Sequence, residues 1–159
     1  MPRAFRWFTE HEVTMGDEAF HQAPTPEARR RPSVLIADDS AEQRWTLRLA
    51  LSMMGFDVRE AADGRELFWA LEELSRVGSP EPSLVIADVY MPSYDGLEVL
   101  EAWKDTMAGR AVIFITAFPD SVVSRRIESL GAELLPKPFS LRAFSECVRS
   151  SLRRARAPS

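Results

Sequence analysis

The chain of 159 residues is long enough for one globular domain, and its net charge of −4 gives no general reason to expect direct nucleic-acid binding. Cys147 is the only cysteine, which excludes a disulfide framework and a cysteine-rich metal site and fits a reducing cytoplasm. No apolar stretch approaches the roughly 20 residues that cross a bilayer, and residues 1–10 lack a secretory signal, so we expect a cytoplasmic protein without membrane insertion.

Residues 1–32 show no strand pattern and contain prolines that break regular structure. We interpret them as an N-terminal extension, flexible as chain ends commonly are. The aromatic residues Phe5, Trp7 and Phe8 offer a less favoured alternative, a short segment that contacts a partner or the domain's own surface.

From residue 33 onward, short apolar runs alternate five times with segments whose apolar residues have helical spacing, a pattern typical of a parallel sheet wrapped by helices. The predicted strands are 33–37, 56–60, 83–87, 111–115 and 133–136. The residues predicted to face the sheet are Leu47, Ala50, Leu51 and Met54; Leu67, Leu71 and Leu74; Leu97, Leu100 and Met107; Val123, Ile127 and Leu130; and Leu141, Phe144, Val148 and Leu152. Ser40, Asp63 and Asp95 are the predicted caps of three helices.

The composition of the strands predicts their order. Residues 34–36 and 84–86 are continuously apolar, as in strands buried on both faces, so they belong at the sheet centre. The strand at 56–60 alternates with polar residues, and the fifth contains Pro136, which cannot donate a ladder hydrogen bond, so these two belong at the edges. With right-handed crossovers the predicted fold is α/β, a doubly wound five-stranded parallel sheet with strand order 2-1-3-4-5.

Polar residues follow four of the apolar runs. Asp38 and Asp39 follow the first run, Asp88 the third, Thr116 the fourth and Lys137 the fifth. Because the carboxyl ends of parallel strands share one edge of the sheet, we expect these side chains to meet in a crevice. Three neighbouring carboxylates repel one another without a cation, so they predict a divalent metal, Mg²⁺ first and Mn²⁺ second.

The same crevice suits a phosphoryl group as well as a metal. The predicted metal ligands are Asp38 (through a coordinated water), Asp39, Asp88 and the backbone carbonyl of Tyr90. A phosphoryl group on Asp88 would have its charge neutralised by the metal, by the ammonium of Lys137, and by the Thr116 hydroxyl with the N–H of Ala117. Each residue alone has an ordinary structural interpretation, and their common position at strand ends favours the site.

The sequence resembles the receiver domains of two-component response regulators, including the chemotaxis type. The matching segments are VLIADDS at 34–40, LVIADVYMPSYDG at 84–96, ITA at 115–117 and KPF at 137–139. The resemblance covers about residues 33–153 and leaves 154–159 as a short basic tail. It implies a flavodoxin-like receiver fold in which Asp88 accepts a phosphoryl group from a sensor histidine kinase or a histidine phosphotransfer protein.

The resemblance also implies a cis Lys137–Pro138 bond and a switch in which Thr116 moves toward the phosphoryl group. In the family an aromatic residue of the fifth strand moves with it and alters the surface of the fourth helix, fifth strand and fifth helix, where a downstream protein would bind. This chain has Leu134 at the aromatic position, so half of that switch is missing. Tyr90 and Phe118, two residues beyond Asp88 and Thr116, are large aromatics at the rim, and our hypothesis is that they screen the acyl phosphate from water.

We therefore predict a stand-alone receiver, a phosphoacceptor signalling protein that is not an enzyme beyond catalysing its own phosphotransfer and dephosphorylation. One alternative is a receiver-like interaction module that signals without phosphate, which Leu134 mildly favours. A second is a hydrolase that works through an aspartyl phosphate. The common phosphatase pattern has a second aspartate two residues after the nucleophile, and Tyr90 occupies that position here.

Overall fold

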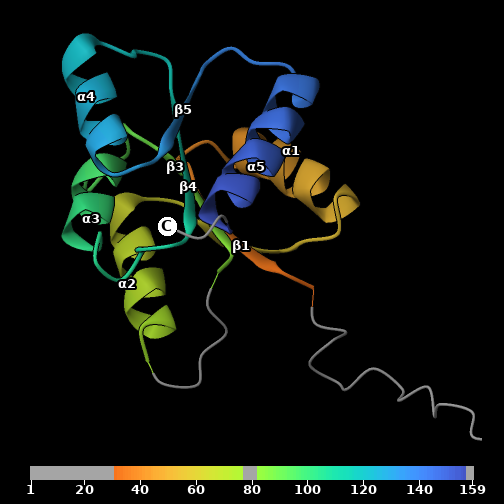
Figure 1. Cartoon of the computed structure of the whole chain (residues 1–159), viewed down its shortest axis with the longest axis horizontal. Helices are drawn as coiled ribbons and strands as arrows, with labels where there is room; N and C mark the ends of the chain where they lie inside the picture. The colour runs from red at the N-terminus through yellow and green to blue at the C-terminus, as the bar shows by residue number, and fades with distance from the viewer. Residues whose placement is uncertain (1–30, 77–81, 157–159) are drawn as a thin grey trace, which may run out of the picture. The chain divides into compact units, whose positions relative to one another are not determined.

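A computed structural model describes residues 31–76 and 82–156 of the chain, in which strands and helices alternate (Figure 1). The strands are β1 (Ser33–Ala37), β2 (Asp57–Ala61), β3 (Leu84–Asp88), β4 (Ala111–Thr116) and β5 (Glu133–Pro136). The helices are α1 (Ala41–Met53), α2 (Gly64–Leu74), α3 (Gly96–Ala102), α4 (Ser121–Ser129) and α5 (Leu141–Ala155). The predicted extension at 1–32 lies almost wholly outside the described residues.

The five strands form one parallel sheet in the order β2-β1-β3-β4-β5, which confirms the predicted topology and both predicted edge strands. In the central pair, Val34 lies opposite Leu84 and Ala37 opposite Ala87. β3 is buried along its whole length, as its continuous apolar run requires once helices cover both faces. The sheet is therefore doubly wound.

Helices cover both faces of the sheet (Figure 1). On one face α1 and α5 pack through Leu47, Leu51, Phe144 and Val148, all of them buried. On the other face α2, α3 and α4 contribute a larger apolar cluster, which includes Leu67, Leu71, Leu97, Leu100, Val123 and Ile127. None of the helices in the described ranges has the length and apolar character needed to cross a bilayer.

The predicted caps begin their helices directly after the loops that follow the strands. Ser40, Asp63 and Asp95 accept hydrogen bonds from the backbone N–H groups of Gln43, Glu66 and Leu97, which would otherwise lack partners at the helix starts. The connection from β1 to α1 is consequently only three residues long, 38–40. Short connections of this kind hold their side chains close to the sheet edge.

Two details differ from the predicted helix faces. Leu141 is 54% exposed, because α5 begins at this residue and it lies at the end of the packed stripe. Met107 is buried as predicted, but α3 ends at Ala102, and Met107 belongs to the turns that precede Gly109, whose φ of 77° is left-handed.

Candidate functional site

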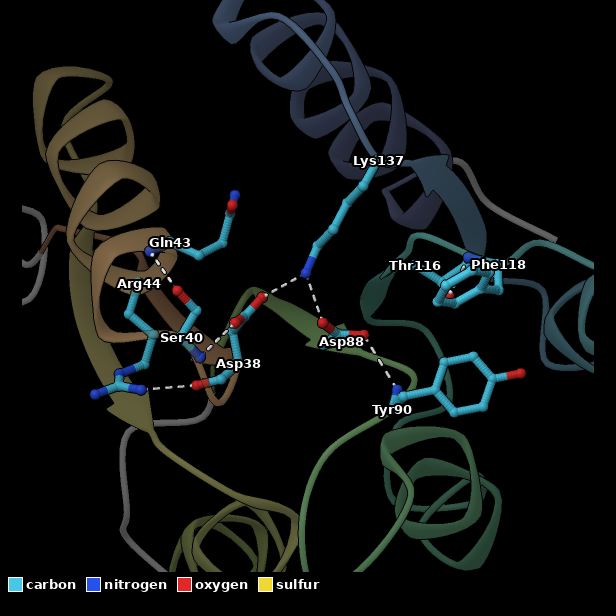
Figure 2. Close-up of polar contacts among 9 residues, drawn as sticks. All are labelled: Asp38, Ser40, Gln43, Arg44, Asp88, Tyr90, Thr116, Phe118 and Lys137. Atoms are coloured by element: carbon cyan, nitrogen blue, oxygen red, sulfur yellow. Dashed lines mark hydrogen bonds and ion pairs between the residues drawn. The ribbon is translucent and has the colours of Figure 1, made fainter.

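The carboxyl edge of the sheet brings together the polar residues predicted to share a crevice, and Figure 2 shows all of them except Asp39. Asp38 follows β1, Asp88 is the last residue of β3, Thr116 is the last residue of β4, and Lys137 follows β5. The strand register aligns these ends, since Asp88 lies opposite Ile115 and Thr116 lies opposite Pro136. The site is thus built by the parallel topology from segments far apart in the chain.

Three carboxylates form the acidic part of the site. Asp38, Asp39 and Asp88 each place an oxygen within 4.8 Å of the others. Asp38 and Asp88 are buried, at 1% and 8% exposure, while Asp39 is exposed. Oxygen ligands without histidine or cysteine suit a hard cation such as Mg²⁺, and the mutual repulsion of the carboxylates favours binding one. The residues therefore fit the predicted metal.

Lys137 lies between two of these carboxylates. Its Nζ is 2.9 Å from Asp38 Oδ2 and 2.5 Å from Asp88 Oδ2 (Figure 2). Burial raises the pKa of Asp88 above its usual value, against the opposing hydrogen bond and charge of Lys137. Burial alone would lower the pKa of Lys137, but its hydrogen bonds to Asp88 and Asp38 outweigh this and raise it. Lys137 is accordingly a charged ammonium at neutral pH.

The N–H, the carbonyl and the carboxylate of Asp38 all make hydrogen bonds, whereas the carboxylate of Asp39 makes none among the described residues. The Asp38 N–H donates to Ala61 O at 3.2 Å, and Asp38 Oδ1 accepts from Ser40 N at 2.8 Å. Its carbonyl accepts from Arg44 Nη1 at 2.8 Å. In the part of the chain that the structure describes, the Asp39 carboxylate has no hydrogen bond or ion pair. Asp39 is therefore the carboxylate most available to a metal.

The hydroxyl of Thr116 is completely buried and has one fixed contact. Its Oγ1 accepts from Phe118 N at 3.1 Å, which leaves the hydroxyl proton available to donate elsewhere. On the neighbouring strand, Asp88 Oδ1 accepts from Tyr90 N at 3.1 Å. The predicted Ala117 is exposed at the same strand end.

Two aromatic rings meet at the rim of the site. The rings of Tyr90 and Phe118 make an edge-on contact, with centroids 6.4 Å apart and an interplanar angle of 66°. Both remain open to solvent, at 46% and 72% exposure. Figure 2 shows the pair beside Asp88, on the side opposite α1. The ring contact joins the loop that follows β3 to the loop that follows β4.

The neighbourhood of β5 holds two further predicted features. The peptide bond between Lys137 and Pro138 is cis. Leu134 pairs with Phe114 across the β4–β5 ladder and is only partly buried against the α2–α4 side of the sheet. An aliphatic side chain thus occupies the position at which the family resemblance implies an aromatic one.

Sequence reasoning did not identify Arg44 as a residue of the site. Its guanidinium contacts the Asp38 carbonyl through Nη1 and Glu60 through Nε. The chain contains many arginines, and nothing in the local sequence distinguishes this one. Only the packing of α1 against the ends of β1 and β2 brings these groups together.

Comparison with known proteins identifies the family that this chain resembles. The family model of the response regulator receiver domain matches residues 34–149. The response regulator MprA of Mycolicibacterium vanbaalenii is 39% identical over 124 residues, which are 76% of this chain and 50% of that protein. MprA of Mycobacterium tuberculosis is 36% identical over 126 residues, 77% of this chain and 51% of that protein. The chain therefore spans about half the length of these curated relatives.

Solved structures show the same architecture. The chemotaxis protein CheY4 of Vibrio cholerae superposes with a TM-score of 0.66 at 25% identity, covering 76% of this chain and 98% of that one. A response regulator receiver domain protein of Clostridium thermocellum gives a TM-score of 0.67 at 25% identity, covering 77% and 95%.

Proposed function

This chain belongs to the response regulator receiver domain family, and on that premise we propose that Asp88 accepts a phosphoryl group from the phosphohistidine of a sensor kinase or a histidine phosphotransfer protein. The observation that carries the proposal is the position of Lys137, whose ammonium is 2.9 Å from Asp38 Oδ2 and 2.5 Å from Asp88 Oδ2 at the sheet edge. The ammonium of Lys137 pairs with both buried carboxylates, and its side chain is 23% exposed. It provides a cation where a phosphoryl group would bring negative charge.

The residues that would hold Mg²⁺ are Asp39 and Asp88, with Asp38 orienting a coordinated water and the Tyr90 carbonyl as a further oxygen. The carboxylate of Asp39 supports its own assignment as a ligand, because it has no hydrogen bond or ion pair among the described residues. When bound, Mg²⁺ supplies positive charge that offsets the carboxylates and the phosphoryl oxygens.

In the transfer step, a carboxylate oxygen of Asp88 forms a bond to phosphorus while the phosphorus–nitrogen bond of the donor breaks. The bonding electron pair stays on the imidazole nitrogen of the donor. Lys137 donates to one phosphoryl oxygen, and the Thr116 hydroxyl with the Ala117 N–H donates to another. Catalysis is mainly this positioning and neutralisation of charge.

Tyr90 and Phe118 are proposed to control how long the phosphoryl group lasts. Hydrolysis of an acyl phosphate requires a water molecule to approach the phosphorus in line with the bond to Asp88. Rings in mutual contact at the rim limit that approach, whereas small or polar side chains would admit and orient water. The phosphorylated protein is thus expected to be long-lived.

The output is proposed to be a change in the binding of a downstream protein at the α4–β5–α5 surface. Thr116 lies at the end of β4, and its hydroxyl accepts a hydrogen bond from the backbone N–H of Phe118. A movement of Thr116 would therefore also move Phe118. With Leu134 instead of an aromatic residue on β5, we expect the signal to reach α4 chiefly through the segment that contains Phe118. We place these events in the cytoplasm, where sensor kinases present their phosphohistidine.

Phosphorylation with a small donor tests the proposal against its alternatives. The full chain is incubated with ³²P-labelled acetyl phosphate and MgCl₂, beside Asp88→Asn and the matched control Asp63→Asn. Asp63 caps α2 and is not one of the three clustered carboxylates, and asparagine caps about as well as aspartate. We expect one phosphate per chain in the parent and in Asp63→Asn, and none in Asp88→Asn.

The other outcomes identify the alternatives. Repeated turnover with release of phosphate would indicate an aspartyl-phosphate hydrolase. No labelling of the parent would indicate an interaction module that works without phosphate. Equal labelling of Asp88→Asn and the parent would show that the acceptor is a different residue.

A further inference from the structure

The side chain of Arg44 joins the loop that carries Asp38 and Asp39 to the edge strand β2. Its Nη1 donates to the Asp38 carbonyl at 2.8 Å (Figure 2). Its Nε is 3.2 Å from Glu60 Oε2. We propose that Arg44 is a positioning residue for metal binding, which fixes the direction in which Asp39 presents its carboxylate. This inference rests on the proposed function, since it concerns the same Mg²⁺ site.

The backbone geometry makes Asp39 dependent on this contact. The carbonyl of Asp38 and the amide of Asp39 belong to one rigid peptide plane. A hydrogen bond to the Asp38 carbonyl therefore sets the orientation of that plane and the starting point of the Asp39 side chain. Because the Asp39 carboxylate has no hydrogen bond or ion pair of its own among the described residues, the backbone that carries it determines where its side chain starts.

The Asp38 side of this plane is held independently of Arg44. The Asp38 N–H bonds to Ala61, and its carboxylate bonds to the Ser40 N–H and Lys137. Loss of the Arg44 contact would therefore leave Asp38 in place and release the peptide plane that follows it. The expected defect is specific to Asp39.

Glu60 explains how a cation is tolerated next to a metal site. A guanidinium near bound Mg²⁺ would weaken metal binding by repulsion. Glu60 offsets this charge through an ion pair whose side chains are 16% exposed at Arg44 and 31% exposed at Glu60. The planar guanidinium makes both contacts at once, which the single ammonium of a lysine would do less well.

Arg48 provides a matched control one helical turn later. Its Nε is 3.3 Å from Glu60 Oε1, so the two arginines share one carboxylate. Arg48 is 53% exposed and has no contact with Asp38 among the described residues. Any effect that depends only on the charge or pairing of Glu60 should therefore appear in variants of both arginines.

The test is a titration of ¹⁵N-labelled full-length chain with MgCl₂, in which the backbone amide signals of Asp39 and Ser40 report binding. We compare the parent with Arg44→Gln, Arg44→Lys and Arg48→Gln. Loss of a residue that orients a metal ligand commonly weakens affinity by about tenfold or more, and we expect this for Arg44→Gln. We expect an intermediate loss for Arg44→Lys and a change of less than about twofold for Arg48→Gln.

A second measurement separates positioning from a general structural role. Labelling of Asp88 by acetyl phosphate should be slow in Arg44→Gln at low Mg²⁺ and should return to the parent rate at saturating Mg²⁺. Signals far from the loop should match the parent. If Arg44→Gln does not fold, Arg44→Lys replaces it in the test, and we expect it to bind Mg²⁺ more weakly than the parent does.

Three results would overturn the inference: equal Mg²⁺ affinity in the parent and the Arg44 variants, equal loss in Arg44→Gln and Arg48→Gln, or a labelling rate that does not recover at saturating Mg²⁺. A parent that binds no Mg²⁺ would instead refute the proposed function, so the two failures are distinguishable.

Discussion

The site has an inner side, formed by the buried carboxylates of Asp38 and Asp88, and an outer side, formed by the Tyr90–Phe118 pair and Leu134. The two sides differ in how firmly their side chains are held. Asp38 and Asp88 are buried and bound by several backbone and side-chain donors. Phe118 is 72% exposed, and Leu134 lies half-buried on an edge strand. On the proposed function, the group that accepts phosphate therefore lies in the firmly held part of the site. The lifetime of the phosphoryl group and the transmission of the signal would depend on the more exposed side chains.

Lys137 gives the most severe test of that contrast, because its ammonium pairs with both carboxylates of the inner side. Lys137→Met should slow labelling of Asp88 by about a hundredfold, the usual cost of losing one donor to developing negative charge. It should at the same time strengthen Mg²⁺ binding, since a competing cation leaves Asp38 and Asp88. Labelling rates and MgCl₂ titrations measure both effects.

The control is Lys104→Met, the same substitution at the only other lysine of the chain. It should change neither quantity. If Lys137→Met is labelled at the parent rate, the ammonium has no role in transfer and the buried carboxylates act without it.

Variants of Tyr90 and Phe118 test whether the exposed outer side of the site controls the lifetime of the phosphoryl group. The double variant Tyr90→Asn, Phe118→Glu should lose phosphate about tenfold faster, equivalent to about 1.4 kcal/mol in the barrier, because water gains access and an orienting polar group. The decay of labelled protein after removal of the donor measures this. Tyr94→Asn, an exposed aromatic outside the pair, is the control. Decay no faster than in the parent would contradict the screening role.

The variant Leu134→Tyr tests whether an aromatic residue on β5 improves transmission of the signal to the α4–β5–α5 surface. Phosphorylation should then shift the amide signals of α4, β5 and α5 further than in the parent. The expected difference corresponds to about a fivefold larger ratio of active to inactive form. Leu135→Tyr, next in the strand and packed on the other face, is the control. An unchanged response would mean that the Phe118 segment carries the signal without help from β5.

The ion pair between α3 and α4 gives the smallest expected effect. Arg126 donates to both carboxylate oxygens of Glu101 at 2.8 and 2.7 Å, and this hydrogen bonding lowers the pKa of Glu101 from its ordinary 4.5. A carboxyl with a lowered folded pKa adds stability above its unfolded pKa and loses it as the pH falls through the folded value. The pair should therefore act at neutral pH and not in acid.

Arg126 and Glu101 are both partly exposed, so solvent weakens their ion pair. We therefore expect Glu101→Gln to lower the free energy of unfolding by about 0.5 kcal/mol at pH 7. The difference should vanish once the pH is below the folded pKa, as measured by urea unfolding. Glu146→Gln removes the more exposed pair with Arg142 and should change less. A loss well above 1 kcal/mol at pH 7 would show that α4 is held more firmly than the comparison of the two sides assumes.

The sequence predicted the fold well because its signals are local or periodic. Apolar runs and caps such as Ser40 and Asp95 located the elements, with the second and third strands each displaced by one residue. The polar strand ends predicted which side chains would meet, since parallel topology brings them to one edge. Leu141 was placed in the core wrongly, because helical spacing alone does not show where packing on the sheet ends.

Contacts that depend on the angle between packed elements could not be predicted. The bond from Arg44 to the Asp38 carbonyl requires a particular placement of α1 over the ends of β1 and β2. The edge-on contact of Tyr90 and Phe118 depends on the paths of two separate loops. Residue type and spacing contain no information about either geometry.

The ion pair of Lys137 with Asp38 spans 99 residues of sequence, and that with Asp88 spans 49. During synthesis the three aspartates therefore leave the ribosome well before their ammonium, which follows the last strand of the sheet. A chain without its last strand lacks the ammonium that pairs with Asp38 and Asp88. On the proposed function, full competence to accept phosphate would therefore require the complete sheet.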